Sequence, residues 1–87
     1  MIAISYAPSF LRQLKTMPVD LQDAVCDIVE EFKYQKNHKT VKVHTLHGRL
    51  QDRWSFSVDY RTRIVFIYGE IKEEVVFLAI GSHDVYK

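Results

Sequence analysis

Two short segments, 64–68 and 75–80, are apolar at nearly every position, and they constrain the fold more than any other feature of the chain. Segments of this length with two apolar faces are typical of the central strands of a sheet. The preceding segment, 53–60, alternates apolar and polar residues, which predicts a strand with one buried face. Because only short connections separate the three segments, we expect them to pair as antiparallel hairpins.

The first third of the chain predicts one strand and two helices. Residues 1–6 alternate as in a strand, and Pro8 suits the first turn of a helix over 8–16. Pro18 then ends that helix and begins another over 18–33. The apolar residues of this second helix recur at helical spacing and form one stripe: Leu21, Val25, Ile28, Val29 and Phe32.

The predicted order of elements is therefore β-α-α-β-β-β. This order gives an α+β fold, in which a helical hairpin covers one face of an antiparallel sheet and leaves the other face partly open. The chain of 87 residues predicts a single domain, 1–87. No apolar run approaches the length of a membrane span, and the N-terminus lacks the layout of a signal peptide.

The single cysteine, Cys26, excludes an internal disulfide and is consistent with the reducing cytoplasm. Its spacing within the second helix predicts a buried structural thiol rather than a nucleophile.

Charge is segregated along the chain although the net charge is only +1. The stretch between Phe32 and Gln51 contains no acid, but it holds five cations and three of the four histidines. The helix before it is acidic on its exposed side: Asp20, Asp23, Asp27, Glu30 and Glu31. Such segregation suits a domain with one face toward phosphate, and it equally suits a solvated basic loop.

Four features converge on the open side of the predicted sheet. They are two histidines in the acid-free loop, two arginines at the start of the third strand, two residues of the C-terminal tail and one tryptophan: His44 and His47, Arg61 and Arg63, His83 and Tyr86, and Trp54. Two residues apart on an extended chain, the two arginines are expected to share a face. Each feature also has a plainer interpretation: strand-end capping for His83, surface ion pairs for the arginines, and core packing for Trp54. The loop histidines resemble part of a zinc site, but the loop offers no cysteine or acid to complete four ligands.

Together these residues suit the cleavage of RNA by its own 2′-hydroxyl. That reaction needs a base for the hydroxyl, an acid for the leaving 5′-oxygen, and cations around the phosphorane. Histidine suits both proton transfers near neutral pH, and arginine donates two hydrogen bonds to phosphate. An aromatic ring such as that of Trp54 can stack on an unpaired base. No metal or other cofactor is required.

The sequence resembles the toxins of the RelE/ParE superfamily of type II toxin–antitoxin modules, most closely the RelE/YafQ-like branch. The resemblance lies in the loop His44-Thr45-Leu46-His47-Gly48, in the segment from Tyr60 to Phe66, which has the form Y-R-x-R-I-V-F, and in a tail from Gly81 to Tyr86. It implies a cytoplasmic, ribosome-dependent endoribonuclease that cuts mRNA in the ribosomal A site and is silenced by a cognate antitoxin. Where RelE carries paired lysines on the second strand, this chain has Trp54 and Phe56.

By position, the resemblance implies catalytic roles for His83, Arg63, His44 and Tyr86. It also implies that the substrate is bound by Arg61, Lys42, His47, Arg49 and Trp54. Two alternatives remain open within the superfamily. One is a ParE-like inhibitor of DNA gyrase without nuclease activity, against which the tail histidine argues. The other is an inactive homologue that serves as an antitoxin partner or corepressor.

Overall fold

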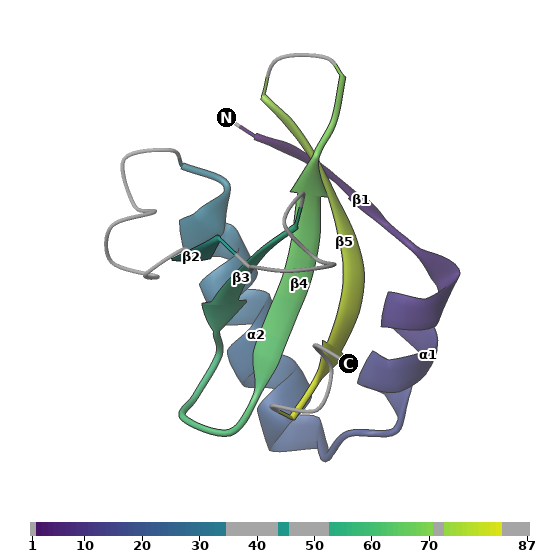
Figure 1. Ribbon diagram of the computed structural model, residues 1–87. Helices are drawn as coiled ribbons and strands as arrows, with labels where there is room; N and C mark the ends of the chain where they lie inside the picture. Colours follow the sequence, from purple (N-terminus) through teal and green to yellow (C-terminus); the bar gives the residue numbers. More distant parts are fainter. Residues whose placement is uncertain (1, 35–43, 46–52, 71–72, 83–87) are drawn as a thin grey trace.

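A five-stranded sheet forms the centre of the computed structural model, which describes residues 2–34, 44–45, 53–70 and 73–82 (Figure 1). The elements in chain order are β1 (Ala3–Tyr6), α1 (Pro8–Lys15), α2 (Val19–Phe32), β2 (His44–Thr45), β3 (Trp54–Ser57), β4 (Arg63–Tyr68) and β5 (Glu74–Gly81). The predicted α+β order is therefore confirmed, and the short strand β2 adds to it within the segment expected to be a loop.

The strands lie in the order β1-β5-β4-β3-β2. Antiparallel pairing of β3 with β4 and of β4 with β5 is as predicted. The sheet is nevertheless mixed rather than purely antiparallel, because β1 runs parallel to β5, with Ala3 opposite Glu74 and Tyr6 opposite Phe77. The alternation within β1 indicates a strand, but it does not indicate which neighbour the strand meets or in which direction. Residues 7–73, which include both helices and the strands β2 to β4, form the long connection that parallel pairing needs.

Both helices lie on the same side of the sheet, with α2 crossing behind β3 and β4 and α1 beside β5 (Figure 1). Pro8 opens α1, where its missing N–H costs nothing, and Pro18 immediately precedes α2. The stripe on α2 is buried at Val25, Val29 and Phe32, and the five acids on its other side are exposed, as predicted. Cys26 is exposed, so the expectation of a buried thiol is wrong. It follows Val25 directly and is therefore turned about 100° away from it around the helix axis.

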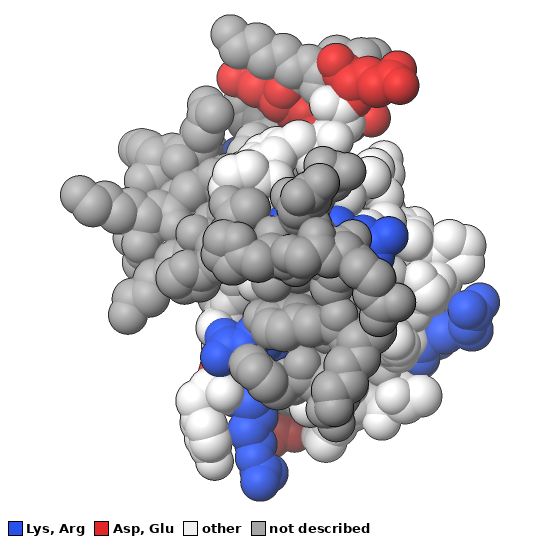
Figure 2. Space-filling model, viewed as in Figure 1, with Lys and Arg blue, Asp and Glu red and all other residues white. Residues whose placement is uncertain are grey.

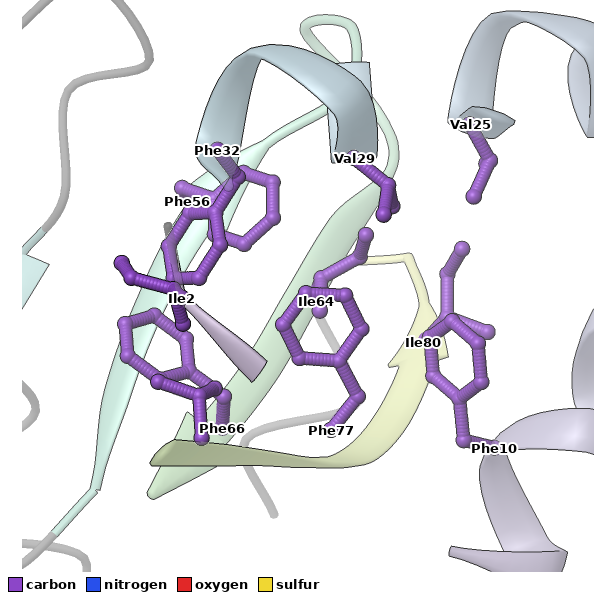
Figure 3. Close-up of a cluster of buried hydrophobic side chains, with 11 residues drawn as sticks. Ile2, Phe10, Val25, Val29, Phe32, Phe56, Ile64, Phe66, Phe77 and Ile80 are labelled. Carbon is purple, nitrogen blue, oxygen red and sulfur yellow. The ribbon is translucent and has the colours of Figure 1, made fainter. Parts of the chain in front are cut away.

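The core is built around phenylalanine rings from both helices and the sheet: Phe10, Phe32, Phe56, Phe66 and Phe77. Phe32 of α2 stacks on Phe56 with 4.8 Å between ring centroids and meets Phe66 edge-on at 5.1 Å (Figure 3). Such offset and edge-on arrangements stabilise aromatic pairs beyond the burial of their area. Phe56 therefore serves packing and is closed to solvent.

A bulge in β5 ties that strand to α1. The register shifts between Val65 and Phe66 of β4, which leaves Leu78 as the extra residue of β5. The Leu78 carbonyl accepts a hydrogen bond from Ser9 Oγ at 2.7 Å, and the Ile80 N–H donates to Gln13 Oε1 at 2.9 Å. The polar side chains of α1 thereby satisfy backbone groups near the bulge and fix the end of β5, from which the tail continues.

The sheet face opposite the helices is closed in its middle. Ser55 and Val65, which are register partners on this face, are only 2% and 3% exposed. The next row, formed by Ser57, Arg63 and Gly81, is half-buried. Within the described residues this face is therefore closed in the middle and half-buried at both ends, with Ile67 and Val76 at the far end and the Arg63 row where β4 begins.

Candidate functional site

Arg63 is the first residue of β4, and its side chain is held by β3. The ladder places Arg63 opposite Ser57 on one side and opposite Gly81 on the other. Its guanidinium Nη1 donates a hydrogen bond to Ser57 Oγ. Because the acceptor is a neutral hydroxyl, this bond orients the guanidinium without neutralising its charge.

That charge is not offset by an acid within the part of the chain that the structure describes. The ion pair formed there joins Lys33 to Glu30 at 2.9 Å on α2. Arg63 is thus half-buried and oriented, and no acid of the described ranges pairs with it; an oriented guanidinium is what a phosphate oxygen or a developing oxyanion requires. Sequence reasoning found Arg63 but missed Ser57, whose only signal is its place on the polar side of the alternating segment 53–60.

Arg61 lies in the turn between β3 and β4, where Asp59 fixes the backbone. Asp59 Oδ1 accepts hydrogen bonds from the N–H groups of Arg61 at 2.8 Å and Thr62 at 2.6 Å. The Val58 N–H also donates to the Thr62 carbonyl at 2.8 Å. The two arginines were expected to share a face of an extended strand. That expectation is wrong, because Arg61 lies in the turn before β4 and not in the extended strand.

The same turn shifts the pKa of Asp59. Partial burial acts to raise this pKa, but the N–H groups of Thr62 and Arg61 stabilise the carboxylate. The Thr62 hydroxyl and the Arg61 charge act in the same direction, and the pKa of Asp59 is lowered below its usual value. The carboxylate is therefore ionised wherever the protein is folded near neutral pH.

Trp54 lies on the face opposite Arg63. It packs against the core cluster together with Val58, and its ring meets Tyr68 edge-on at 5.2 Å. Burial raises the pKa of the Tyr68 phenol. The structure therefore does not bring Trp54 to the arginines, and its contacts are those of a packing residue.

The backbone of His44 lies in the edge strand β2, opposite Ser55 of β3. The remaining predicted site residues lie outside the described residues: Lys42, His47, Arg49, His83 and Tyr86. The tail that carries His83 and Tyr86 continues from β5, whose last residue, Gly81, pairs with Arg63. Among the described residues, no group of three or more histidine, cysteine or acidic side chains could hold a metal ion.

Charge is separated along β4. Arg61 and Arg63 lie at its first end; Glu70 and Glu73 lie in the connection beyond its other end, and Glu74 begins β5. In Figure 2 one group of acidic side chains lies at the top, where β4 and β5 connect, and the Lys and Arg side chains in view lie further down, with smaller acidic areas beside them. The two ends of β4 are about 17 Å apart, which is more than a Debye length at physiological salt. An anion at Arg63 is therefore screened from the acids.

A concavity lies between the helices, away from the arginines. It has a volume of about 190 Å³ and is lined by Tyr6, Phe10, Leu11, Leu14, Val25, Cys26 and Val29. No charged side chain lines it, so this groove does not suit phosphate chemistry. Neither helix within the described ranges combines the length and the hydropathy that crossing a bilayer requires.

No family model matches the sequence, and no curated protein is similar enough to count as a relative. Solved structures do match across nearly the whole chain. The toxin–antitoxin complex RelBE2 from Mycobacterium tuberculosis aligns with a TM-score of 0.72, covering 94% of this chain and 98% of that chain at 17% identity. The chain has the fold of the RelE-type toxins.

Two further structures show how widely this RelE-type fold is shared. YafQ from E. coli aligns with a TM-score of 0.63 at 14% identity, covering 99% of this chain and 98% of that one. A YoeB/ParE toxin from Agrobacterium tumefaciens aligns with a TM-score of 0.69 at 13% identity, covering 94% and 99%. At these identities the likeness concerns the fold, and the choice among activities depends on the site residues.

Proposed function

We propose that this protein is the toxin of a type II toxin–antitoxin module and that it cleaves mRNA in the ribosomal A site. The observation that carries this proposal is the arrangement of Arg63, whose guanidinium is oriented by Ser57 and has no acidic partner among the described residues. A gyrase inhibitor has no need of an oriented cation for a phosphorane. A nuclease that uses no metal does need one.

In the proposed reaction the 2′-hydroxyl of one nucleotide attacks the adjacent phosphorus, and the 5′-oxygen of the next nucleotide leaves. Arg63 stabilises the negative charge that gathers on the non-bridging oxygens. His83 serves as the general acid or base, with His44 as its partner, and Tyr86 assists in proton transfer. Lys42, His47, Arg49 and Arg61 bind the flanking phosphates.

We further propose an antitoxin as the protein's partner. The fold is shared with toxins solved together with their antitoxins, including RelBE2. An antitoxin that buries acidic side chains against Arg61 and Arg63 would silence the toxin by occupying the phosphate site. The Ser57–Arg63–Gly81 end of the sheet is a half-buried region that carries these cations.

The test is a translation extract programmed with a defined mRNA, to which the purified protein is added. We expect mRNA cuts at codons in the ribosomal A site, together with arrest of protein synthesis. The same preparation is assayed for inhibition of gyrase supercoiling. Uncut mRNA with inhibited supercoiling would contradict the nuclease proposal and favour the ParE-like alternative, while activity in neither assay would favour an inactive homologue.

A further inference from the structure

Tyr60 is the most exposed of the large hydrophobic side chains in the described part of the chain. It is 85% exposed, whereas the other exposed tyrosines, Tyr6, Tyr34 and Tyr68, range from 41% to 45%. Tyr6 and Tyr68 each pack an edge against core rings. The predicted strand over 53–60 would have placed Tyr60 on the buried face, but β3 ends at Ser57, so that prediction is wrong for Tyr60.

The exposure of Tyr60 results from a well-anchored turn. The Asp59 carboxylate accepts two backbone N–H groups, and the Val58 N–H donates to the Thr62 carbonyl across the base of the turn. Thr62 is itself 7% exposed, so the far end of the turn is anchored in the protein. The backbone at Tyr60 is thus held in place while its ring projects, which reduces the entropy lost when a ligand binds.

The ring also has a cationic neighbour. The Arg61 guanidinium lies over the Tyr60 ring, 5.9 Å from its centroid. Arg63, with its oriented guanidinium, begins the strand immediately after the turn. An exposed ring, a guanidinium beside it and a second guanidinium nearby are what a single-stranded nucleic acid requires: a surface for a base and donors for the phosphates on either side.

We propose that Tyr60 and Arg61 form a stacking platform for an unpaired RNA base next to the scissile phosphate at Arg63. The proposal rests on the proposed function and adds a base-binding subsite to it. It gives Tyr60 the stacking role that the sequence suggested for Trp54, which packs on the opposite face of the sheet. Because every base has a stacking surface, the platform contributes affinity with little sequence preference.

The test uses an mRNA whose A-site codon carries 2-aminopurine, a base whose fluorescence falls when it stacks. A 2′-O-methyl group at the cleavage position blocks attack. Wild-type protein on programmed ribosomes is expected to quench the probe, and Tyr60→Phe to quench it equally. Tyr60→Leu is expected to lose the quenching and to weaken binding by roughly 5- to 150-fold, the range for one base–aromatic stack.

Cleavage of unmodified mRNA gives the second readout. For Tyr60→Leu we expect KM to rise by a similar factor while kcat changes less than threefold, because the platform binds substrate and does not touch the reacting atoms. Arg61→Gln should show the same pattern more weakly. Tyr34→Leu is the matched control, since it removes an exposed tyrosine at the end of α2 and should leave both readouts unchanged. Thermal melts confirm that each variant is folded.

The outcomes separate this inference from the proposed function. If wild-type protein cuts mRNA and Tyr60→Leu retains both the quenching and the KM, the platform is refuted and the nuclease proposal stands. Failure of the wild type to bind or cut the RNA would refute both. If Tyr60→Leu loses affinity for the antitoxin but not for RNA, the turn belongs to the antitoxin interface and the stacking platform is wrong.

Discussion

The hydrogen bond from Arg63 to Ser57 joins residues of two different strands, which the register of β3 and β4 places opposite each other. An acid at position 57 would neutralise the guanidinium, and an apolar residue would leave it free to rotate. A serine hydroxyl orients the charge and preserves it, which is what a group that stabilises a transition state requires.

Arg63→Ala is expected to lower mRNA cleavage by ~2–4 kcal/mol of transition-state stabilisation, the range for the loss of one oxyanion donor. The protein should remain folded, because the side chain is only half-buried and lies outside the core cluster. Single-turnover cleavage on programmed ribosomes measures the effect. Arg53→Ala, which removes an exposed arginine just before β3, is the control and should cut at nearly the wild-type rate.

Ser57→Ala tests the positioning role directly. We expect kcat to fall about tenfold with little change in KM, since the guanidinium remains present but is less well oriented. Ser57→Thr keeps the hydroxyl and should restore most of kcat. A similar loss in both variants would indicate a packing defect and contradict the positioning role.

His83→Gln should remove a proton-transfer group and lower cleavage by ~10²–10⁴, the usual effect of losing a general acid or base. His44→Gln should have a comparable effect if His44 is the partner base and a smaller one if it only binds phosphate. Rates across pH 5 to 9, with thermal melts beside them, distinguish loss of a titrating group from unfolding. A folded His83→Gln protein that cuts at the wild-type rate would exclude His83 from the mechanism.

At the scale of whole elements, the pattern of apolar residues predicted most of what the structure contains. The apolar stripe predicted the bounds of α2, and the apolar segments predicted those of β4 and β5, each to within one or two residues. This is because the burial of an element requires apolar residues at the spacing of a helix or a strand. The turn after Ser57 was missed, since its cause is the Asp59 carboxylate capping two N–H groups, and alternation continues through Tyr60 without revealing it. The partner of Arg63 was missed for a related reason: it depends on register, which one strand alone does not specify.

The Asp59 turn predicts a dependence of stability on acid. Because the pKa of Asp59 is lowered in the folded protein, its contribution is present above the ordinary carboxylate pKa, about 3.9, and is lost as pH falls through the folded value. Asp59→Asn keeps an acceptor oxygen but removes the charge, so it should lower stability near pH 7 by roughly 0.2–1 kcal/mol, since solvent screens the charge of this exposed carboxylate. Thermal melts from pH 7 to pH 2 should show that the difference in stability between wild type and Asp59→Asn disappears in acid. Asp23→Asn, on the exposed side of α2, controls for the removal of one negative charge; a difference that persists at pH 2 would contradict the assignment.

At the scale of the whole molecule, the acidic side of α2 and the arginines at the start of β4 lie on different surfaces. The acids of α2 lie on the exposed side of a helix that covers one sheet face, while Arg61 and Arg63 lie where the β3–β4 turn meets the other face. A molecule with a net charge of only +1 can therefore still present two arginines at one partner surface, away from the acids of α2. RNA and an acidic antitoxin would compete for that surface.

Antitoxin binding should therefore depend on the arginine end of the sheet and on salt. With an acidic antitoxin that binds this protein, we expect Arg61→Glu combined with Arg63→Glu to slow association about tenfold or more at low salt, and the difference from wild type to shrink as salt rises. The matched variant, Asp23→Lys with Asp27→Lys on α2, reverses the same number of charges and should leave the association rate within about twofold.

Single Ala or Gln variants at Arg63 and His83 should still bind, because a broad interface tolerates the loss of one side chain. Stopped-flow measurement of the association rate at several salt concentrations tests which surface the antitoxin approaches. A rate sensitive to the α2 variant and indifferent to the arginine variant would place the antitoxin on the acidic helix and contradict the proposed mode of silencing.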